Sequence, residues 1–368
     1  MTLTALPPLD RAEAYYVRIP FRRPFETAVG VFASRNSWIL RLRDFEGRDG
    51  FGEIALNPAA ASSEEDRLAA ALREALAELG AGRLPATVLE GAAGLEGRAL
   101  LAGLDEALEA LERARQAGRG GAGPAVSVPV NATLDAWETA DGAEAAHLAV
   151  AKGFTCLKLK VGPETTAALV DLVAAIRRAI PAAVRLRLDA NCSWTHSMAV
   201  ERLEAVAPYD IEYVEQPLAA GDLEGHAELR RECTVPIALD ESVDSSETAA
   251  AALAAGAADV LVVKPARVGG PAVVREIAAR AAAAGVPVVV STFFETGIGT
   301  AAAVWAAAEL PVVGRARAHG LATAGMLEHD LLRVSTSVTR GRISLPRKMA
   351  VDEAALERYT VQKIGPGR

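Results

Sequence analysis

The stretch RLRLDAN, residues 185–191, is a short strand-like run that leads to a carboxylate, Asp189. The arrangement recurs twice, with Glu215 in the segment IEYVEQP and Asp240 in PIALDES. The three carboxylates are 26 and 25 residues apart, which is the length of one strand, one helix and two loops. Acidic groups at the carboxyl ends of successive strands are typical of a (β/α)8 barrel, which brings those ends to one mouth.

Lysines occupy the same place on two further runs. Lys158 and Lys160 lie in CLKLKVG, and Lys264 follows four apolar residues in VLVVKPA. Alternate residues of a strand share one face, so Lys158 and Lys160 are expected to point together into the barrel. Polar groups on that face near a strand's carboxyl end hold the catalytic position of this fold.

The chain of 368 residues is long enough for a barrel of roughly 250 residues and one further module. We predict an N-terminal α+β capping domain at 1–125, completed by the C-terminal segment at about 338–368, and a catalytic (β/α)-barrel domain at 126–337. Helices are expected in the capping domain at 65–79 and 98–116, and the glycine-rich GRGGAGP segment marks the boundary.

The barrel elements follow a regular rhythm of apolar runs and amphipathic segments. The eighth strand is expected within GRARAHGLAT. The other strands are predicted at 127–134, 156–161, 185–190, 211–216, 236–241, 260–265 and 287–293.

Composition excludes several classes of protein. A net charge of −8 without a basic cluster argues against nucleic acid as a partner. The alanine-rich stretch at 278–284 is interrupted by Arg280 and is too short to span a membrane. Cys156, Cys192 and Cys233 lack CxxC spacing, and the N-terminal segment lacks the pattern of a secretion signal, so a cytoplasmic location is expected. A homo-oligomer is compatible with the sequence, which does not fix the oligomeric state.

The acidic groups predict a metal site. A helix cap or a loop salt bridge could explain one acidic residue after a strand, but three on consecutive units would repel one another without a cation. Oxygen ligands with no His or Cys beside them favour Mg²⁺ or Mn²⁺ over zinc. Burial and a neighbouring cation both lower the pKa of a lysine, which suits removal of a proton α to a carboxylate.

The ordered motifs KLK, LDAN, VEQP, LDES and VKP resemble those of the enolase superfamily, in particular its muconate lactonizing enzyme subgroup, over nearly the whole chain. The resemblance implies that Lys160 is the base, that the neighbouring Lys158 lowers its pKa, and that Lys264 lies across the ring. It also implies a Mg²⁺ ion. The implied metal ligands are Asp189, Glu215 and Asp240, and the implied supporting polar groups are Asn191 and Glu241.

Within the family, VVKPARVGG, STFFETGIG and HGLATAGML resemble o-succinylbenzoate synthases. That resemblance implies dehydration of a small-molecule carboxylate, 2-succinyl-6-hydroxy-2,4-cyclohexadiene-1-carboxylate, to the menaquinone precursor o-succinylbenzoate. Dipeptide epimerases carry an Asp-x-Asp near the eighth strand, which GRARAHGLATAGM lacks. A dipeptide epimerase or N-acylamino acid racemase remains an alternative. Outside the family, a Schiff-base aldolase using Lys264 and a non-catalytic binding barrel remain open.

Substrate contacts are expected around the seventh strand and the capping domain. Some synthases carry an arginine just after LDAN, where this chain has Cys192, so the substrate carboxylate is expected to meet Arg35 or a loop amide. Phe293, Phe294, Phe32 and Trp38 are expected either to form an apolar pocket or to pack within the capping domain. The full set of expected substrate-binding residues is Arg35, Ser291, Thr292, Phe293 and Glu295.

Overall fold

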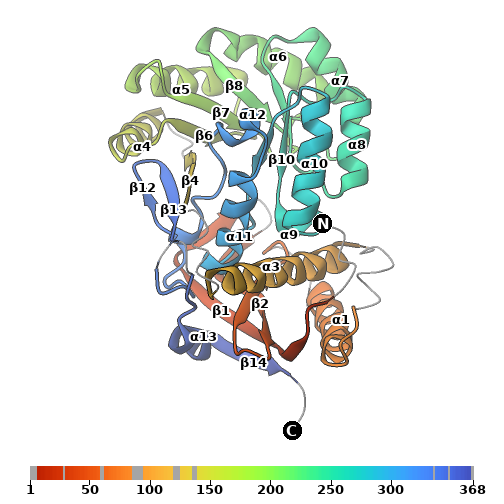
Figure 1. The fold of residues 1–368 in the computed structure, drawn as a ribbon. Helices are drawn as coiled ribbons and strands as arrows, with labels where there is room; N and C mark the ends of the chain where they lie inside the picture. Colours follow the sequence, from red (N-terminus) through yellow and green to blue (C-terminus); the bar gives the residue numbers. More distant parts are fainter. Residues whose placement is uncertain are drawn as a thin grey trace.

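The structure, a computed structural model, places an α+β domain beneath a barrel of strands and helices (Figure 1). It describes residues 6–27, 30–58, 62–84, 94–118, 125–134, 139–334, 336–346 and 349–365. Residues 119–124, which make up most of the GRGGAGP segment expected to mark the domain boundary, lie outside the described residues.

An antiparallel sheet forms the base of the capping domain. Its strand order is β14-β1-β2-β3, and these strands span Thr360–Ile364, Leu9–Thr27, Gly30–Asp44 and Asp49–Ile54. The side chains of β2 alternate between its two faces. Trp38, Leu40 and Leu42 join the core of the capping domain, whereas Ile39 joins the core of the barrel.

Two helices cover this sheet. The structure has α1 at Ser62–Gly80 and α3 at Gly94–Gly118, each a few residues longer than the sequence predicts. Glycines let α3 approach β3 very closely, because a Cβ atom on Gly52 would lie 2.0 Å from the carbonyl oxygen of Gly103. The long helix α3 lies between the capping sheet and the barrel (Figure 1).

Seven parallel strands form most of the barrel, in the order β11-β10-β9-β8-β7-β6-β5. From β5 to β11 they span Ala132–Leu134, Cys156–Lys160, Arg185–Asp189, Ile211–Glu215, Ile237–Leu239, Val260–Val263 and Val288–Val290. All seven fall within the predicted strand regions. The first predicted strand is divided, because Val126–Pro129 forms a separate strand, β4, that pairs elsewhere.

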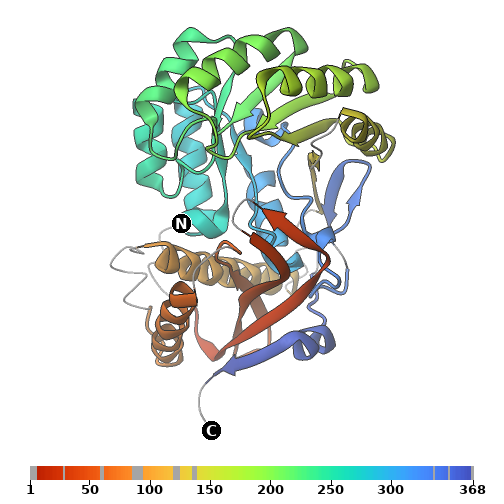
Figure 2. The ribbon, with the colours of Figure 1, turned by 180° about the vertical axis from the view of Figure 1, so that it is seen from behind.

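Helices lie between these strands and cover the outside of the barrel (Figures 1 and 2). They are α4 to α8, α10 and α11, spanning Thr139–Ala151, Thr166–Ala179, His196–Val206, Leu223–Glu232, Ser246–Ala254, Pro271–Ala283 and Gly297–Ala308. Shorter helical segments are η1, α9, α12 and η2, at Ala207–Tyr209, Pro265–Val268, Val312–Arg315 and Ala324–Met326.

The eighth strand position is occupied by a very short segment. Gly320 forms a parallel bridge to Ser291, and His319 forms one to Val130, so the ring closes within the region that the sequence indicates. The fully buried Arg187 supports this closure, because its Nη1 donates a hydrogen bond of 2.8 Å to the carbonyl oxygen of Ala318. The fold is therefore a (β/α)8-type barrel with a capping domain.

The C-terminal segment does not return to the capping domain as one piece. Helix α13 (Glu353–Tyr359) and strand β14 lie beside β1 (Figure 2). Strand β13 (Arg342–Leu345) instead pairs with β4, and the short β12 (Val338–Thr339) pairs with β13. The buried side chains of β13 explain this difference, because they join the core of the barrel.

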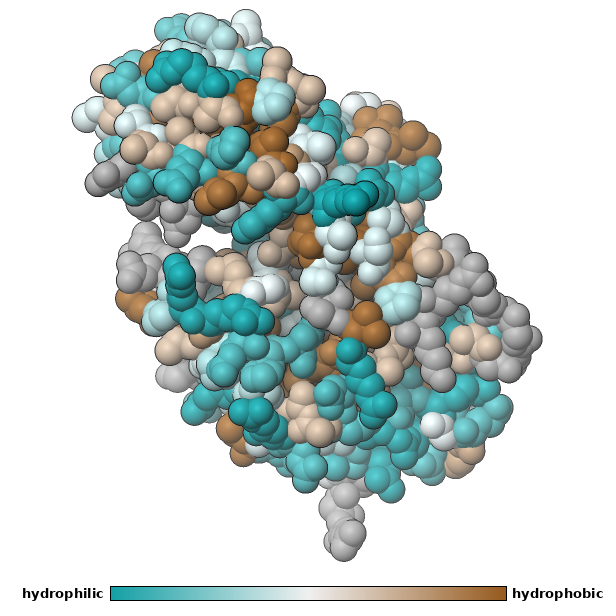
Figure 3. Space-filling model, turned by 90° about the vertical axis from the view of Figure 1, so that its left-hand side faces the viewer, coloured by the Kyte–Doolittle hydropathy of each residue, from teal (hydrophilic) through white to brown (hydrophobic). Residues whose placement is uncertain are grey.

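The junction between the two domains is partly apolar, since Val17, Ile19 and Ile39 of the capping sheet join the core of the barrel. In the space-filling view, hydrophobic residues gather where the upper barrel and the lower capping domain meet (Figure 3). None of the helices in the described ranges is long and apolar enough to cross a membrane.

Candidate active site

Strand register brings three of the predicted site residues into one row. Lys160 of β6 pairs with Asp189 of β7, and Asp189 pairs with Glu215 of β8. All three lie at the carboxyl ends of their strands, at the mouth of the barrel. The parity argument from the sequence therefore places these side chains on a common interior face.

The two lysines of β6 bind the carboxylates of the next strands. Lys158 Nζ lies 2.8 Å from Asp189 Oδ2 and 3.0 Å from Glu215 Oε1. Lys160 Nζ lies 2.7 Å from the same oxygen of Asp189. Asp189 and Glu215 are each 1% exposed, and buried ionised carboxylates require either an ion-pair partner or a bound metal ion.

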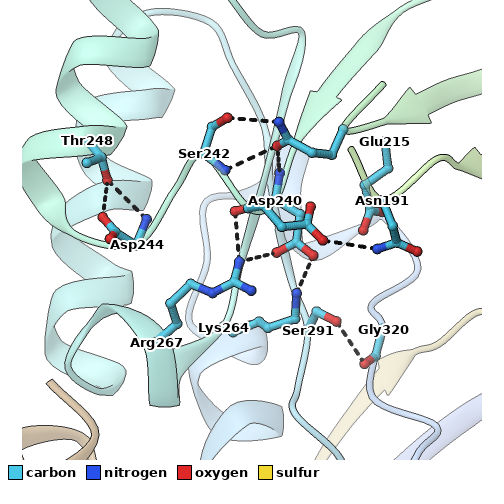
Figure 4. A network of polar contacts seen from close by, with 12 residues as sticks. Asn191, Glu215, Asp240, Ser242, Asp244, Thr248, Lys264, Arg267, Ser291 and Gly320 are labelled. Atoms are coloured by element: carbon cyan, nitrogen blue, oxygen red, sulfur yellow. Dashed lines mark hydrogen bonds and ion pairs between the residues drawn. The ribbon is translucent and has the colours of Figure 1, made fainter. Parts of the chain in front are cut away.

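A second group of charges lies across the ring, at the ends of β9 and β10 (Figure 4). Asp240 follows β9 directly, and Lys264 follows β10. The Lys264 ammonium forms an ion pair with Asp240 Oδ2, and Arg267 Nη1 donates to Asp240 Oδ1 over 2.9 Å. The ring of Phe293 lies 5.3 Å from Lys264 Nζ, in cation–π geometry.

Asn191 connects the two groups. Its Oδ1 accepts a hydrogen bond of 2.6 Å from Lys160 Nζ, and its Nδ2 donates one of 3.0 Å to Glu241 Oε1. The backbone of Asn191 has φ +44°, a left-handed conformation that asparagine tolerates better than most residues. The two supporting residues expected from the LDAN and LDES motifs thus touch each other.

The charges shift the acid–base properties of the lysines in opposite directions. For Lys158, burial alone would lower the pKa, but the carboxylates of Asp189 and Glu215 raise it well above its ordinary value. This differs from the general expectation of a lowered lysine pKa, because two anions flank this ammonium. Burial lowers the pKa of Lys264, although Asp240 opposes the shift.

The pKa values of the carboxyl groups of Asp189 and Glu215 also shift in opposite directions. Burial opposes ionisation of Asp189, but Lys158 and Lys160 lower its pKa overall. Burial, followed by the charge of Asp189, raises the pKa of Glu215 to about 7.

Donor chemistry fits a divalent cation at this cluster. Among the described residues, no three acidic, His or Cys side chains converge as a ready-made cation site. The ammonium group of Lys158 lies between the carboxylates of Asp189 and Glu215. The three carboxylates supply only oxygen donors, which suits Mg²⁺. The raised pKa of Glu215 indicates that the cluster would accommodate more positive charge.

The residues expected to contact substrate divide into two groups. Ser291, Thr292 and Phe293 follow β11 at the mouth, and Thr292 Oγ1 lies 2.8 Å from Thr323 Oγ1. Glu295 is 3% exposed, and its carboxylate accepts a hydrogen bond from the backbone N–H of Phe293.

Arg35 and Trp38 of β2 have different environments. Arg35 is 2% exposed, and its Nε and Nη2 atoms have no hydrogen-bond partner among the described residues. For Trp38 the structure agrees with the second of the two alternatives expected from the sequence, packing within the capping domain. It packs in the core of the capping domain, 5.1 Å from the ring of Tyr16.

Two neighbours of Asp240 were not identified from the sequence. Arg267 lies one helical turn after Lys264, and its position in VVKPAR is the only sequence signal for it. Gln216 has a left-handed backbone with φ +43°. Its side-chain oxygen accepts hydrogen bonds from the backbone N–H groups of Asp240 and Ser242, at 3.0 and 3.1 Å. Both residues therefore hold the segment after β9 in place.

Comparison with known proteins agrees with this geometry. The family model described as Enolase C-terminal domain-like matches residues 140–349, which is more than half of the chain. The chain belongs to this family, within the enolase superfamily.

The similar proteins with assigned activities catalyse reactions that differ from one another. The o-succinylbenzoate synthase of Thermobifida fusca is 40% identical over 207 residues, which cover 56% of this chain and 62% of that protein. The N-succinylamino acid racemase of Thermus thermophilus is 31% identical over 314 residues, 80% of each chain. The solved muconate lactonizing enzyme from Pseudomonas putida matches with a TM-score of 0.80 and 25% identity, over 96% of this chain and 100% of that one. The matched region thus spans less than two thirds of the Thermobifida protein.

Proposed function

We propose that this protein is a Mg²⁺-dependent o-succinylbenzoate synthase, which dehydrates 2-succinyl-6-hydroxy-2,4-cyclohexadiene-1-carboxylate. The observation that carries the proposal is the placement of lysines on both sides of a carboxylate cluster, with Lys160 on β6 and Lys264 after β10. Such a pair can reach the two faces of a substrate carbon whose proton is acidified by a neighbouring carboxylate.

The three acidic residues would hold the metal. Asp189, Glu215 and Asp240 would bind Mg²⁺ through oxygen, and the ion would supply positive charge for the oxygens of an enediolate. The lysine ammonium groups that pair with these carboxylates would then turn toward the substrate.

A single lysine, Lys160, can carry out both proton transfers of the dehydration. Lys160 removes the α-proton from the ring carbon, and the electron pair of the C–H bond moves into the enediolate. The enediolate then expels the ring hydroxyl group. In a syn elimination, Lys160 returns the same proton to the departing oxygen, so that water leaves. Lys264 stays protonated on the opposite face and stabilises the enediolate. Gain of aromaticity drives the step.

Arg35 is the best candidate to bind the succinyl carboxylate. Its guanidinium is buried, and two of its nitrogens have no hydrogen-bond partner among the described residues. A carboxylate can accept both N–H groups of an arginine in a bidentate pair. Arg35→Met should therefore raise KM for a succinyl substrate much more than it lowers kcat.

Racemisation of an N-succinylamino acid is the second candidate. The racemase of Thermus thermophilus matches over 80% of both chains, and a substrate of this kind also has a succinyl carboxylate and an acidic α-proton. A dipeptide is less suitable, because residues 314–326 contain no acidic side chain that could bind its ammonium group.

A direct assay distinguishes these functions. The purified protein with Mg²⁺ is offered the cyclohexadiene carboxylate, an N-succinylamino acid and L-Ala-L-Glu, and kcat/KM is measured for each. We expect dehydration to dominate. Faster racemisation of the N-succinylamino acid would make the second candidate the main function, and epimerisation of the dipeptide alone would overturn both.

A further inference from the structure

Glu53, at the end of the GFGE motif in β3, extends its side chain from the capping domain to the barrel. The carboxylate accepts hydrogen bonds at Oε2 from the backbone N–H of Thr296 at 2.9 Å, the hydroxyl of Thr296 at 2.6 Å and the backbone N–H of Gly299 at 3.2 Å. Glu53 and Thr296 are 243 residues apart in the chain. These three donors lie at the N-terminus of α11.

Such an arrangement is a helix cap supplied by another domain. The first N–H groups of a helix have no partner within it, and its N-terminus carries partial positive charge. Glu53 is fully buried, so its carboxylate depends on these donors. Ser37 donates a further hydrogen bond of 2.7 Å to Oε1.

Neighbouring residues hold Glu53 at this place. The carboxylate of Glu106 on α3 accepts a hydrogen bond of 2.9 Å from the backbone N–H of Glu53. Helix α11 leaves room for the Glu53 carboxylate, because a Cβ atom on Gly299 would lie 3.1 Å from its Oε2. The same Cβ would lie 2.8 Å from Cβ of Glu295.

The N-terminus of α11 is also the end of a short segment of the active site. Residues 291–295 connect β11 to Thr296, the N-cap residue of α11. The segment includes Phe293, whose ring lies beside Lys264 and Arg267. A connection this short transmits any displacement of Thr296 to the residues at the mouth of the barrel.

We propose that Glu53 is a positioning residue of the active site. By capping α11 from the capping domain, it fixes the segment 291–295 relative to the substrate. The proposal rests on the proposed function only in that this segment contacts the substrate, and it holds for whichever substrate the enzyme turns over.

The test is Glu53→Gln, which keeps the size of the side chain but places an amide N–H₂ against groups that donate. We expect KM of the substrate that the wild-type enzyme turns over to rise about 10- to 100-fold, with a smaller change in kcat. Hydrogen exchange of the peptide that contains Thr296 and Gly299 should become faster. Glu74→Gln, the same change at an exposed position of α1, is the matched control and should leave both measurements unchanged.

A second variant covers the case in which Glu53→Gln does not fold. Ser37→Ala removes one donor to Glu53 and leaves the helix intact, and we expect KM to rise about 3- to 10-fold, in keeping with the net contribution of one intramolecular hydrogen bond. A folded Glu53→Gln enzyme with unchanged KM and unchanged exchange at α11 would overturn the proposal. So would a loss of stability without a change in KM, because it would assign Glu53 a structural role alone.

The exchange measurement separates this inference from the proposed function. It needs no substrate, so faster exchange at α11 supports the cap even if the cyclohexadiene carboxylate is not dehydrated. In that case the proposed function fails, and the positioning role is judged on the substrate that the wild-type enzyme accepts.

Discussion

Arg267 donates hydrogen bonds from Nη1 to both the backbone carbonyl oxygen and Oδ1 of Asp240, each over 2.9 Å. The backbone and the carboxylate of one residue are thus held by a single guanidinium. Because Asp240 also pairs with Lys264, Arg267 fixes the orientation of a carboxylate shared by an expected metal site and an expected acid–base lysine.

Replacing Arg267 with methionine should therefore lower kcat without unfolding the protein. Loss of a partner that orients a metal-binding carboxylate typically costs about 10- to 100-fold in activity or metal affinity. The measurement is steady-state kinetics at saturating Mg²⁺, with Arg231→Met at an exposed position of α7 as the control. An unchanged kcat would show that Lys264 and Gln216 hold Asp240 sufficiently.

Glu215→Gln and Asp240→Asn should each weaken Mg²⁺ binding and abolish turnover, because each removes an anionic oxygen ligand. Calorimetric titration with Mg²⁺ should show weaker binding than for the wild type. Far-UV circular dichroism should show a native spectrum, which indicates that the fold is intact. Chelation of the wild-type enzyme should likewise remove activity. Full activity in excess chelator would contradict the ligand assignment and revive a Schiff-base mechanism at Lys264.

Lys160→Ala should lose proton transfer at the α-carbon. General acid–base groups contribute roughly 10² to 10⁴ in rate, and a weak carbon acid demands the upper part of that range. The loss should appear both in turnover and in exchange of the substrate α-proton with deuterated solvent, followed by NMR. Turnover near the wild-type rate would mean that another residue is the base.

Stability should depend on pH through Glu295. Burial raises the pKa of this carboxyl from its usual 4.5 to about 7. Below pH 4.5 both the folded and the unfolded chain hold the proton, whereas between pH 4.5 and 7 only the folded chain holds it. The free energy of unfolding should therefore fall as the pH rises through this window, by about 3 kcal/mol at most from this group.

Glu295→Gln removes that dependence, since an amide does not titrate. Urea unfolding at pH 5 and pH 8 measures it for both proteins, and the decrease in unfolding free energy should be smaller for the variant. If the unfolding free energies of the wild type and the variant changed equally with pH, other buried carboxyl groups, such as Glu106, would be responsible for the dependence.

Gly52→Ala should destabilise the capping domain. Its new Cβ would lie 2.0 Å from the carbonyl oxygen of Gly103, so β3 and α3 would have to move apart. Overpacking of this kind costs about 1–3 kcal/mol. The midpoint of urea unfolding measures the effect, and Gly80→Ala serves as the control, because nothing lies near a Cβ atom there. Equal stability of Gly52→Ala and wild type would show that the helix can shift freely.

The sequence predicted the parts of the site that strand geometry controls. Lys160, Asp189 and Glu215 fall into one row because they end consecutive parallel strands, and their spacing and parity are visible in the chain. The seven strands of the barrel were located for the same reason. For the eighth strand the sequence indicated only a region. This strand has no apolar run, and it is held by two bridges to neighbouring strands and by the hydrogen bond from Arg187.

Contacts between the two domains could not be predicted. Whether Glu53 meets Thr296 depends on how a whole sheet lies against a barrel, and neither local pattern carries that information. The direct pairing of Lys158 with two carboxylates could not be predicted either. The sequence indicated that these charges converge, but not which of them would touch. The sequence left the role of Trp38 open, because the pairing of the capping sheet decides which face of β2 it occupies.

The return of β14 to the edge of β1 has a consequence for how the protein is made. During synthesis on the ribosome, the first strands emerge long before their last partner, and the entire barrel is translated in between. The nascent capping sheet must wait with an open edge, a state in which strands are prone to pair with other chains. Translation must reach residue 364 before that edge is covered along its full observed length.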